Sequence, residues 1–241
     1  MKLSLFGAFL IALMASGLVL VGSIHAVVAQ ASTPVNGILN VDITWTKASS
    51  PYTLTGNVHV DEGVTLTLEP GVTVSFNSYF MNVSGTLHAR GSQTEKIIMT
   101  GSGISYLGEW MGRIFFYSSS TNSIIEYAGI TSSPNAIIGI YSSATTTISS
   151  STIGGTTDNA IYIKGSSPNL IGHVISSNGA NGILIDTNSS PIITANTISN
   201  NTVSGIGINF GSAIISGNNI SYNKYGISDG VFRGTKRAIV F

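Results

Sequence analysis

The chain has 241 residues, a formal net charge of zero at pH 7, 8% charged residues and no cysteine. So few Lys and Arg residues exclude the basic surface through which proteins bind nucleic acid, and we expect no nucleic-acid partner. The absence of cysteine excludes disulfides and thiolate metal sites, so the core alone must hold the fold together. With 43% hydrophobic residues, the chain can build that core.

Residues 1–31 have the form of an export signal. Lys2 precedes an apolar run from Leu3 to Val21, and Ala29-Gln30-Ala31 has the small-x-small pattern of a signal peptidase site. The run is longer than the roughly 7 to 15 residues of most cleaved signals, and it is long enough to span a bilayer. The sequence predicts a secreted or cell-surface protein, which contacts a membrane only if this segment remains as an uncleaved anchor.

Alternating apolar and polar residues begin in the N-terminal half. From Val58 to Phe76 the alternation has the period of two that is typical of strands, and Gly63 and Pro70-Gly71 interrupt it where corners are expected. We expect residues 32–53 to form an N-terminal capping segment and the repeated strands to start at residue 54.

From residue 125 onward the sequence repeats about every 22 residues. Five pairs of apolar residues share one pattern, in which the members of a pair are five positions apart, and their first members are spaced by 23, 22, 23 and 22 residues. A second series of isoleucines follows with spacings of 21, 22, 23 and 21. The pairs are Ile125/Ile130, Ile148/Ile153, Leu170/Ile175, Ile193/Ile198 and Ile215/Ile220, and the second series is Ile140, Ile161, Ile183, Ile206 and Ile227.

This repeat is too short and too rich in β-branched residues for a helical array. In Ile161-Tyr162-Ile163 and Ile183-Leu184-Ile185 the isoleucines share one strand face, which we expect to point inward. Strands of successive rungs then pair in parallel at about 4.8 Å. The predicted fold is an all-β, single-domain, right-handed parallel β-helix over residues 54–230, with roughly eight rungs of about 22 residues.

The repeat also predicts which residues lie at a corner of the later rungs. Asn178, Asn201 and Asn223 each lie three residues after the second isoleucine of their rung, so we expect a stacked structural asparagine column.

Residues 231–241 are expected to form a C-terminal tail. This tail is apolar and has no obvious polar cap, which indicates a short or truncated member, or an end that docks on something.

Several stretches carry a family resemblance: Trp45-Thr46, Ser50-Pro51-Tyr52, Gly56-Asn57-Val58, Gly63 to Val74, and Gly85-Thr86-Leu87. They resemble the opening module of bacterial and archaeal surface β-helix proteins, and Glu109 to Gly112 with Ile114-Phe115-Phe116 looks like the rung that follows it. The later rungs resemble the repeats shared by pectate-lyase-like folds and NosD-type periplasmic proteins. The resemblance implies a parallel β-helix, an architecture that hosts lyases, hydrolases, adhesins and structural rods.

Catalytic residues are scarce in the repeat. Polysaccharide-cleaving β-helices need a carboxylate cluster with a basic proton acceptor, or paired carboxylates. Lys164, Asp186 and Asn209 fall at equivalent positions of successive rungs, so Lys164 and Asp186 are the catalytic candidates. An exposed cross-strand ion pair explains these two residues as well.

Histidines, tyrosines and sequons are the remaining candidates for metal, carbohydrate-contact and glycosylation sites. His59, His88 and His173 have no ligand spacing and are expected at the surface or in turns, so we expect no metal site and no cofactor. Tyr141 and Tyr162 each follow an isoleucine of the second series and should point outward one rung apart, as a carbohydrate-contact platform or merely as residues that favour strands. The possible glycosylation sites are the N-x-S/T sequons at Asn82, Asn188, Asn200 and Asn219.

Together these features favour a non-catalytic secreted or cell-surface β-helix that acts as a scaffold, an adhesin or a carbohydrate-contact module. Its partners would be extracellular polysaccharides or envelope components. The alternative is a polysaccharide lyase or glycoside hydrolase of the pectate-lyase-like fold.

Overall fold

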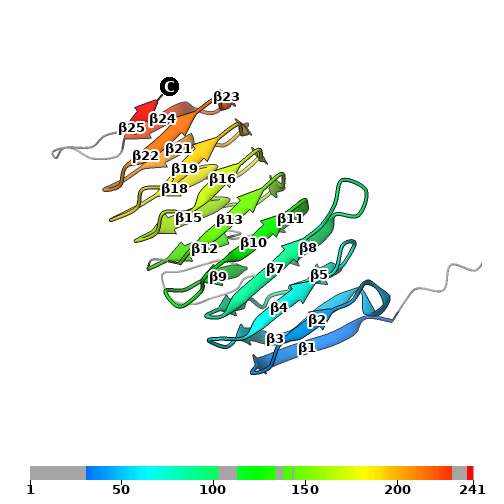
Figure 1. Cartoon of the computed structure of the whole chain (residues 1–241). Coiled ribbons are helices and arrows are strands. Elements are labelled where there is room, and N and C mark those ends of the chain that lie inside the picture. Colours follow the sequence, from blue (N-terminus) through cyan, green and yellow to red (C-terminus); the bar gives the residue numbers. More distant parts are fainter. Residues whose placement is uncertain (1–30, 103–112, 134–137, 143, 230–237, 241) are drawn as a thin grey trace, which may run out of the picture. The chain divides into compact units, whose positions relative to one another are not determined.

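The computed structural model describes residues 31–102, 113–133, 138–142, 144–229 and 238–240. They form a right-handed parallel β-solenoid of about 8 turns, as predicted from the repeat. Figure 1 shows the turns stacked from β1 at one end to β23, β24 and β25 at the other. Residues 1–30, most of the predicted export segment, lie outside the described residues. Within the described ranges, no helix is long and apolar enough to cross a membrane.

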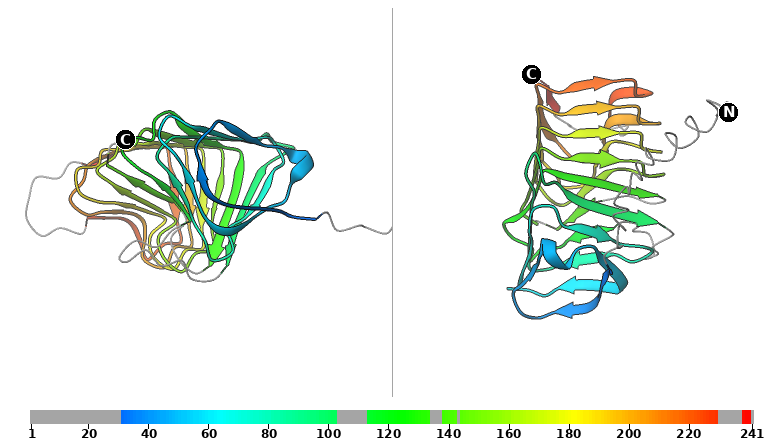
Figure 2. Two further views of the ribbon diagram at one scale, coloured as in Figure 1. Left: turned by 90° about the horizontal axis from the view of Figure 1, so that it is seen from below. Right: turned by 90° about the vertical axis from the view of Figure 1, so that its right-hand side faces the viewer.

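Each turn contributes strands to three faces, which the end-on view of Figure 2 separates. Face 1 is the nine-stranded sheet. It comprises β2 (Ile43–Trp45), β4 (Thr65–Leu68), β7 (Thr86–Arg90), β10 (Ser123–Glu126), β13 (Thr146–Ser149), β16 (Asn169–Ile171), β19 (Ile192–Thr194), β22 (Ala213–Ser216) and β25 (Ala238–Val240).

Faces 2 and 3 are the two halves of the 16-stranded sheet, joined by β3 (Tyr52–Val60), with β1 (Thr33–Leu39) beside it. Face 2 comprises β5 (Thr73–Ser75), β8 (Ile97–Ser102), β11 (Ala128–Ser133), β14 (Thr152–Gly154), β17 (Val174–Ser176), β20 (Thr197–Ser199) and β23 (Asn219–Ser221). Face 3 comprises β6 (Met81–Val83), β9 (Ile114–Phe116), β12 (Ile138–Tyr141), β15 (Ile161–Lys164), β18 (Ile183–Ile185), β21 (Ser204–Ile208) and β24 (Tyr225–Asp229).

The inward isoleucines stack as the repeat predicts. Ile183 pairs with Ile161 on one side and with Ile206 on the other, and its side chain is 0% exposed. Leu184 points outward and is half-buried. Alternation along each strand therefore separates one continuous apolar core from the outer surface.

The register differs from the prediction at one rung. Ile161 pairs with Ile138, not with Ile140, and Ile140 pairs with Ile163. Ile138 and Ile140 of β12 both point inward and are fully buried. Alternation with a period of two is therefore satisfied equally well when either isoleucine pairs with Ile161. Another rung is longer than 22 residues, because Ile125 pairs with Ala89 and the neighbouring contact of Leu87 with Ser123 spans 36 residues.

The solenoid also extends further than expected at both ends. β1 and β2 already pair in parallel with β3 and β4, so residues 32–53, expected to form a cap, build the first turn. The expected C-terminal tail contains β25, which pairs with β22 on face 1. These short strands lack a full repeat of their own, so the register could not reveal them.

From Tyr127 onward, the described corners between faces use the left-handed backbone region. The residues with positive φ fall at equivalent positions of successive rungs, where the chain changes direction from one face to the next. Between faces 1 and 2 they are Tyr127, Ser150, Gly172, Ala195 and Gly217; between faces 2 and 3 they are Gly155, Ser177, Asn200 and Tyr222; between faces 3 and 1 they are Ser142, Gly165, Asn188 and Phe210.

Two columns of amide side chains run along the corners inside the solenoid. In the first, Asn178 Nδ2 donates to Asn201 Oδ1 at 2.7 Å, and Asn201 Nδ2 donates to Asn223 Oδ1 at 2.8 Å. In the second, Asn196 Nδ2 donates to Asn218 Oδ1 at 2.8 Å, and the backbone N–H of His173 donates to Asn196 Oδ1 at 2.8 Å. These hydrogen bonds satisfy buried polar groups along the solenoid axis.

Candidate functional site

An aromatic ladder lies on the outside of face 3. The rings of Phe115 and Tyr141 have centroids 6.0 Å apart, and those of Tyr141 and Tyr162 are 5.7 Å apart. We call these three residues the aromatic ladder. By backbone register, however, the residue between Phe115 and Tyr162 is Gly139. The Tyr141 ring lies over Gly139 and fills this position of the column.

Further aromatic side chains pack beside the ladder. The Tyr117 ring stacks on Tyr141 at 6.1 Å with an interplanar angle of 24°, and Phe80 meets Phe115 edge-on at 5.8 Å. Phe115 is only 1% exposed, while Tyr141 and Tyr162 are half-buried. Burial, with the nearby Tyr117 and Asp158, raises the pKa of Tyr141, so its phenol stays neutral.

Tyr162 is fixed by a carboxylate one rung away. Its hydroxyl donates to Asp186 Oδ2 at 2.6 Å, and the backbone N–H and hydroxyl of Thr187 donate to Asp186 Oδ1 at 2.7 and 3.0 Å. Burial raises the pKa of Asp186, but these hydrogen bonds and the charge of Lys164 outweigh it, so the pKa lies below its ordinary value. Burial and the bond to Asp186 raise the pKa of Tyr162. The pair is a neutral phenol and an ionised carboxylate.

Amide side chains lie two residues before the first residues of β15 and β18, at the opposite ends of these strands from Lys164 and Asp186. Asn181 Nδ2 donates to Asn159 Oδ1 at 2.8 Å, and Asn159 Nδ2 donates to Asp158 Oδ1 at 2.8 Å. Leu184 is the outward residue that pairs with Tyr162 in the next rung. We call the surface formed by Tyr141, Tyr162, Asn181, Leu184 and Asp186 the face 3 platform. It combines aromatic and apolar side chains with an amide and a carboxylate.

The structure brings the predicted site residues together, but in a different arrangement from the expected one. Tyr141 and Tyr162 are neighbours although they are not equivalent in register, since Tyr141 pairs with Lys164. Lys164 lies close enough to lower the pKa of Asp186. The hydrogen bond from Tyr162 to Asp186 was not predicted from the sequence, because only the orientation of the ring decides it.

His173 is a correction to the sequence interpretation. It was expected at the surface or in a turn. It does lie in the corner between β16 and β17, but it is not at the surface: it is 1% exposed and occupies the second amide column. Its Nδ1 accepts the Ser151 N–H at 3.3 Å, and its Nε2 lies 2.8 Å from the Ile148 carbonyl oxygen. The repeat could have revealed this position, since His173, Asn196 and Asn218 are spaced by 23 and 22 residues.

The four sequon asparagines occupy different environments. Asn188, Asn200 and Asn219 are exposed, the first two in left-handed corners. Asn82 is half-buried on face 3, and its Oδ1 lies 3.5 Å from the Tyr117 hydroxyl. Attachment of a glycan is therefore sterically easiest at the three exposed positions.

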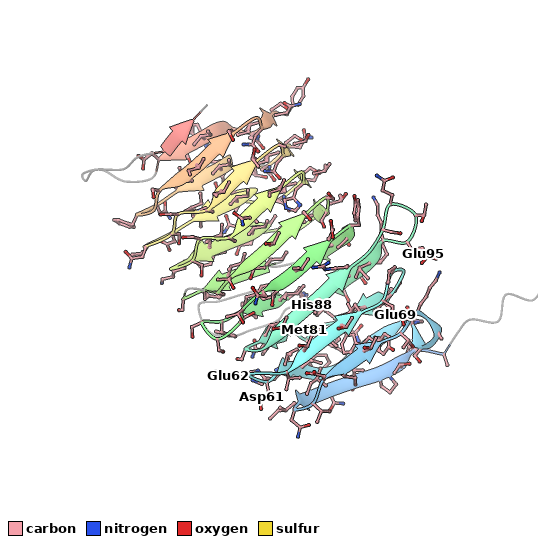
Figure 3. The ribbon with its side chains drawn as sticks, in the orientation of Figure 1. Asp61, Glu62, Glu69, Met81, His88 and Glu95 are labelled. Carbon is pink, nitrogen blue, oxygen red and sulfur yellow. The ribbon has the colours of Figure 1, made fainter. Side chains whose placement is uncertain are left out.

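Acidic residues of the first rungs are divided between two corners. Asp61 and Glu62 precede β4, while Glu69 and Glu95 lie at the opposite ends of the face 1 strands (Figure 3). Within the described part of the chain, no group of three His, Cys, Asp or Glu residues could hold a metal ion. The separation of these carboxylates explains why no such group forms there.

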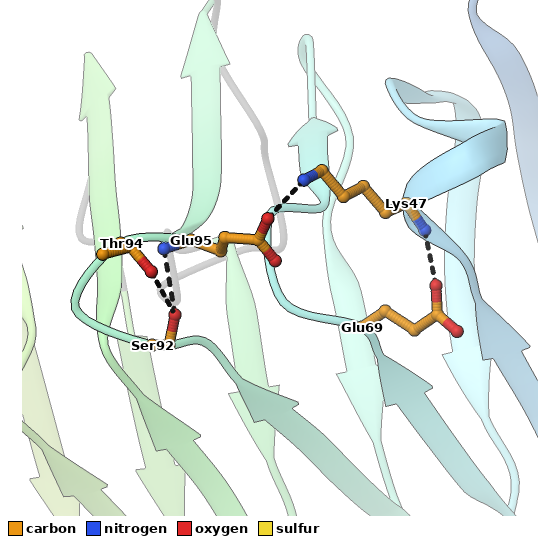
Figure 4. A network of polar contacts seen from close by, with 5 residues as sticks. All are labelled: Lys47, Glu69, Ser92, Thr94 and Glu95. Atoms are coloured by element: carbon orange, nitrogen blue, oxygen red, sulfur yellow. Dashed lines mark hydrogen bonds and ion pairs between the residues drawn. The ribbon is translucent and has the colours of Figure 1, made fainter.

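Glu69 and Glu95 instead hold the short helix η1 (Lys47–Ser49) (Figure 4). The Lys47 N–H donates to Glu69 Oε2 at 2.8 Å, and Lys47 Nζ lies 2.5 Å from Glu95 Oε1. The Glu95 N–H donates to Ser92 Oγ at 3.0 Å. Because the Lys47 and Glu95 side chains are 55% and 45% exposed, this ion pair contributes little to stability. Together, the contacts of Lys47 with Glu69 and Glu95 link the corners that follow β2, β4 and β7.

Two family models agree with this architecture. Residues 37–164 match the family described as pectate-lyase like beta helix domain, and residues 108–231 match the right handed beta helix region. No curated protein matches the chain in sequence. The A-module of mannuronan C-5 epimerase AlgE4 from Azotobacter vinelandii is a similar solved structure, with 13% identity, 87% of each chain covered and a TM-score of 0.35. The family matches each span more than half of the chain, and the protein belongs to the right-handed β-helix family with a pectate-lyase-like β-helix domain.

Proposed function

We propose that this protein is a non-catalytic secreted or cell-surface β-helix that contacts polysaccharide through the face 3 platform. The observation that carries the proposal is the half-buried Tyr162 ring, held on one side by Tyr141 and fixed through its hydroxyl by Asp186. An aromatic ring that is already fixed offers apolar area and a polar edge at little cost in conformational entropy. Sugars present matching apolar C–H faces and hydroxyl edges.

The charges around the platform favour an uncharged polysaccharide. Asp158 and Asp186 contribute two carboxylates, and Lys164 contributes one ammonium group. A polyuronate would bring further carboxylates toward this net negative surface, and such like charges lower affinity. We therefore infer that neutral glycans bind more tightly than polyuronates.

The pKa values of Tyr162 and Asp186 support a non-catalytic role. General acids and bases work best when their pKa lies near the operating pH. The pKa of Asp186 is lowered and that of Tyr162 is raised, so both move away from neutrality. The same hydrogen bond that fixes the ring thus makes Asp186 a weak base and Tyr162 a weak acid.

Binding to a glycan array carrying neutral and uronate polymers tests this function with the full chain. We expect neutral glycans to bind and Tyr162→Ala to weaken that binding about tenfold, which corresponds to ~1.4 kcal/mol of lost contact. Tyr222→Ala is the matched control, because Tyr222 is an 86% exposed tyrosine that is not part of the platform. Equal binding by Tyr162→Ala and Tyr222→Ala would contradict the platform.

A second assay addresses the alternative, a lyase or hydrolase. Pectin, alginate and neutral polymers are incubated with the protein, and unsaturated products and new reducing ends are measured. We expect neither product. Release of either product by the protein, abolished in Asp186→Ala or Lys164→Ala, would replace the binding function with catalysis.

A further inference from the structure

We propose that Gly139 is a positioning residue for the face 3 platform, because its missing side chain allows Tyr141 to complete the aromatic ladder. This inference rests on the proposed function and adds a residue that does not itself touch the ligand. The backbone register and the ring contacts disagree at this position. The residue paired with both Phe115 and Tyr162 is Gly139, yet the ring that touches both belongs to Tyr141.

Tyr141 belongs to the neighbouring outward column. Its partner in the next rung is Lys164, whereas the partner of Tyr162 is Gly139. An outward ring at position 141 would therefore be expected beside Lys164. Instead, the ring turns back along its own strand by two residues and covers Gly139.

Only glycine leaves room for this arrangement. A Cβ atom at position 139 would clash with the ring at Cε2 and would lie 2.8 Å from Oη and 2.9 Å from Cζ of Tyr141. Carbon atoms do not approach so closely without displacement, so any larger residue must push the ring aside. The backbone of Gly139 lies in the regular strand β12, so the need for glycine here is steric and not conformational.

The position of the Tyr141 ring determines what supports Tyr162. With Tyr141 over Gly139, the Tyr162 ring has an aromatic neighbour at 5.7 Å in addition to its hydroxyl contact with Asp186. Displacement of Tyr141 would remove that aromatic neighbour of Tyr162. The ring would then gain freedom that a ligand must remove on binding.

The first test is Gly139→Ala in the full chain, measured by binding to the neutral glycans of the array. We expect binding about tenfold weaker, with the melting temperature changed far less than by a core substitution. Gly129→Ala is the matched control, since Gly129 is also a strand glycine, on face 2, and a Cβ there meets only Ile98 Cδ1 at 3.4 Å. Equal binding by the parent and Gly139→Ala would overturn the inference.

A double substitution gives the converse test. Gly139→Tyr combined with Tyr141→Gly places the ring directly in the column between Phe115 and Tyr162, and we expect it to restore most of the binding lost in Gly139→Ala. No recovery in a double variant that folds like the parent would contradict the ladder as the element that positions Tyr162.

A readout without ligand separates this inference from the proposed function. The ring chemical shifts of Tyr141 and Tyr162, and the near-UV circular dichroism, report ring stacking directly. We expect both signals to change in Gly139→Ala and to stay unchanged in Gly129→Ala. If the parent binds no glycan, the proposed function fails, and these signals still decide whether Gly139 positions the ring; unchanged ring shifts in Gly139→Ala would overturn that.

Discussion

At the scale of single residues, His173 takes the place that asparagine holds in the rungs above it. Its Nδ1 accepts the Ser151 N–H, so the proton of the neutral ring lies on Nε2, which donates to the Ile148 carbonyl. Burial lowers the pKa of His173 to about 4, although its contact with the Ile148 carbonyl opposes this. A protonated ring could no longer accept the Ser151 N–H.

This lowered pKa predicts a loss of stability in acid. Above pH 6.5 the ring is neutral in both the folded and unfolded states, so its full contribution is present there. Between pH 6.5 and about 4 the unfolded chain binds a proton that the folded chain does not, and the free energy of unfolding falls. The loss attributable to His173 is about 3 kcal/mol, measured by urea unfolding across this pH range.

His173→Asn supplies the comparison, because asparagine occupies the equivalent position at Asn196. The variant should show a flatter pH dependence, while carboxylates elsewhere titrate alike in both proteins. His59→Asn, which removes an imidazole from a half-buried outward position, is the control variant. The same slope in His173→Asn and the parent would contradict the assignment.

At the scale of elements, different residues adopt the same left-handed backbone conformation at equivalent corners. Gly172 and Ala195 occupy the same corner in successive rungs, with φ of +69° and +57°. A Cβ at Gly172 would meet nothing closer than Ser150 N at 3.9 Å. An alanine side chain therefore fits at position 172 without a clash, and its cost there lies in the backbone conformation.

Reciprocal substitutions at this corner should have opposite signs. Gly172→Ala should lower the free energy of unfolding by about 1 kcal/mol, since alanine is strained at positive φ. Ala195→Gly should raise it by less than about 1 kcal/mol, because relief of strain is partly offset by the entropy of the unfolded chain. Chemical denaturation measures both changes. A loss in both variants would show that packing, not backbone strain, dominates this corner.

At the scale of the whole molecule, each rung is stabilised by its neighbours. Ile183→Ala should cost about 2 to 5 kcal/mol, because the side chain is 0% exposed and its removal leaves a cavity between Ile161 and Ile206. Leu184→Ser, at the adjacent half-buried outward position, should cost clearly less. Hydrogen exchange should rise first in β15, β18 and β21 and only later in β4. A uniform rise along the chain would contradict coupling between nearest neighbours.

The sequence by itself determined the period, the inward isoleucines and the asparagine positions. A strand that alternates with period two has one inward face, and a repeat of fixed length places equivalent residues in adjacent rungs. Ile183 between Ile161 and Ile206 follows from these two rules alone. The same rules place Asn178, Asn201 and Asn223 at one corner, where the structure shows their hydrogen bonds.

Only the tertiary structure decided which outward side chains meet. Period-two alternation leaves registers two residues apart equally acceptable, so the pairing of Ile138 with Ile161 needed the folded neighbours. The turn of Tyr141 over Gly139 and the bond from Tyr162 to Asp186 depend on side-chain rotation, which local space and partners select. The repeat determines the position of each residue in the solenoid, whereas the contacts of its side chain depend on residues of its own strand, such as Gly139 for Tyr141, and of the next rung, such as Asp186 for Tyr162.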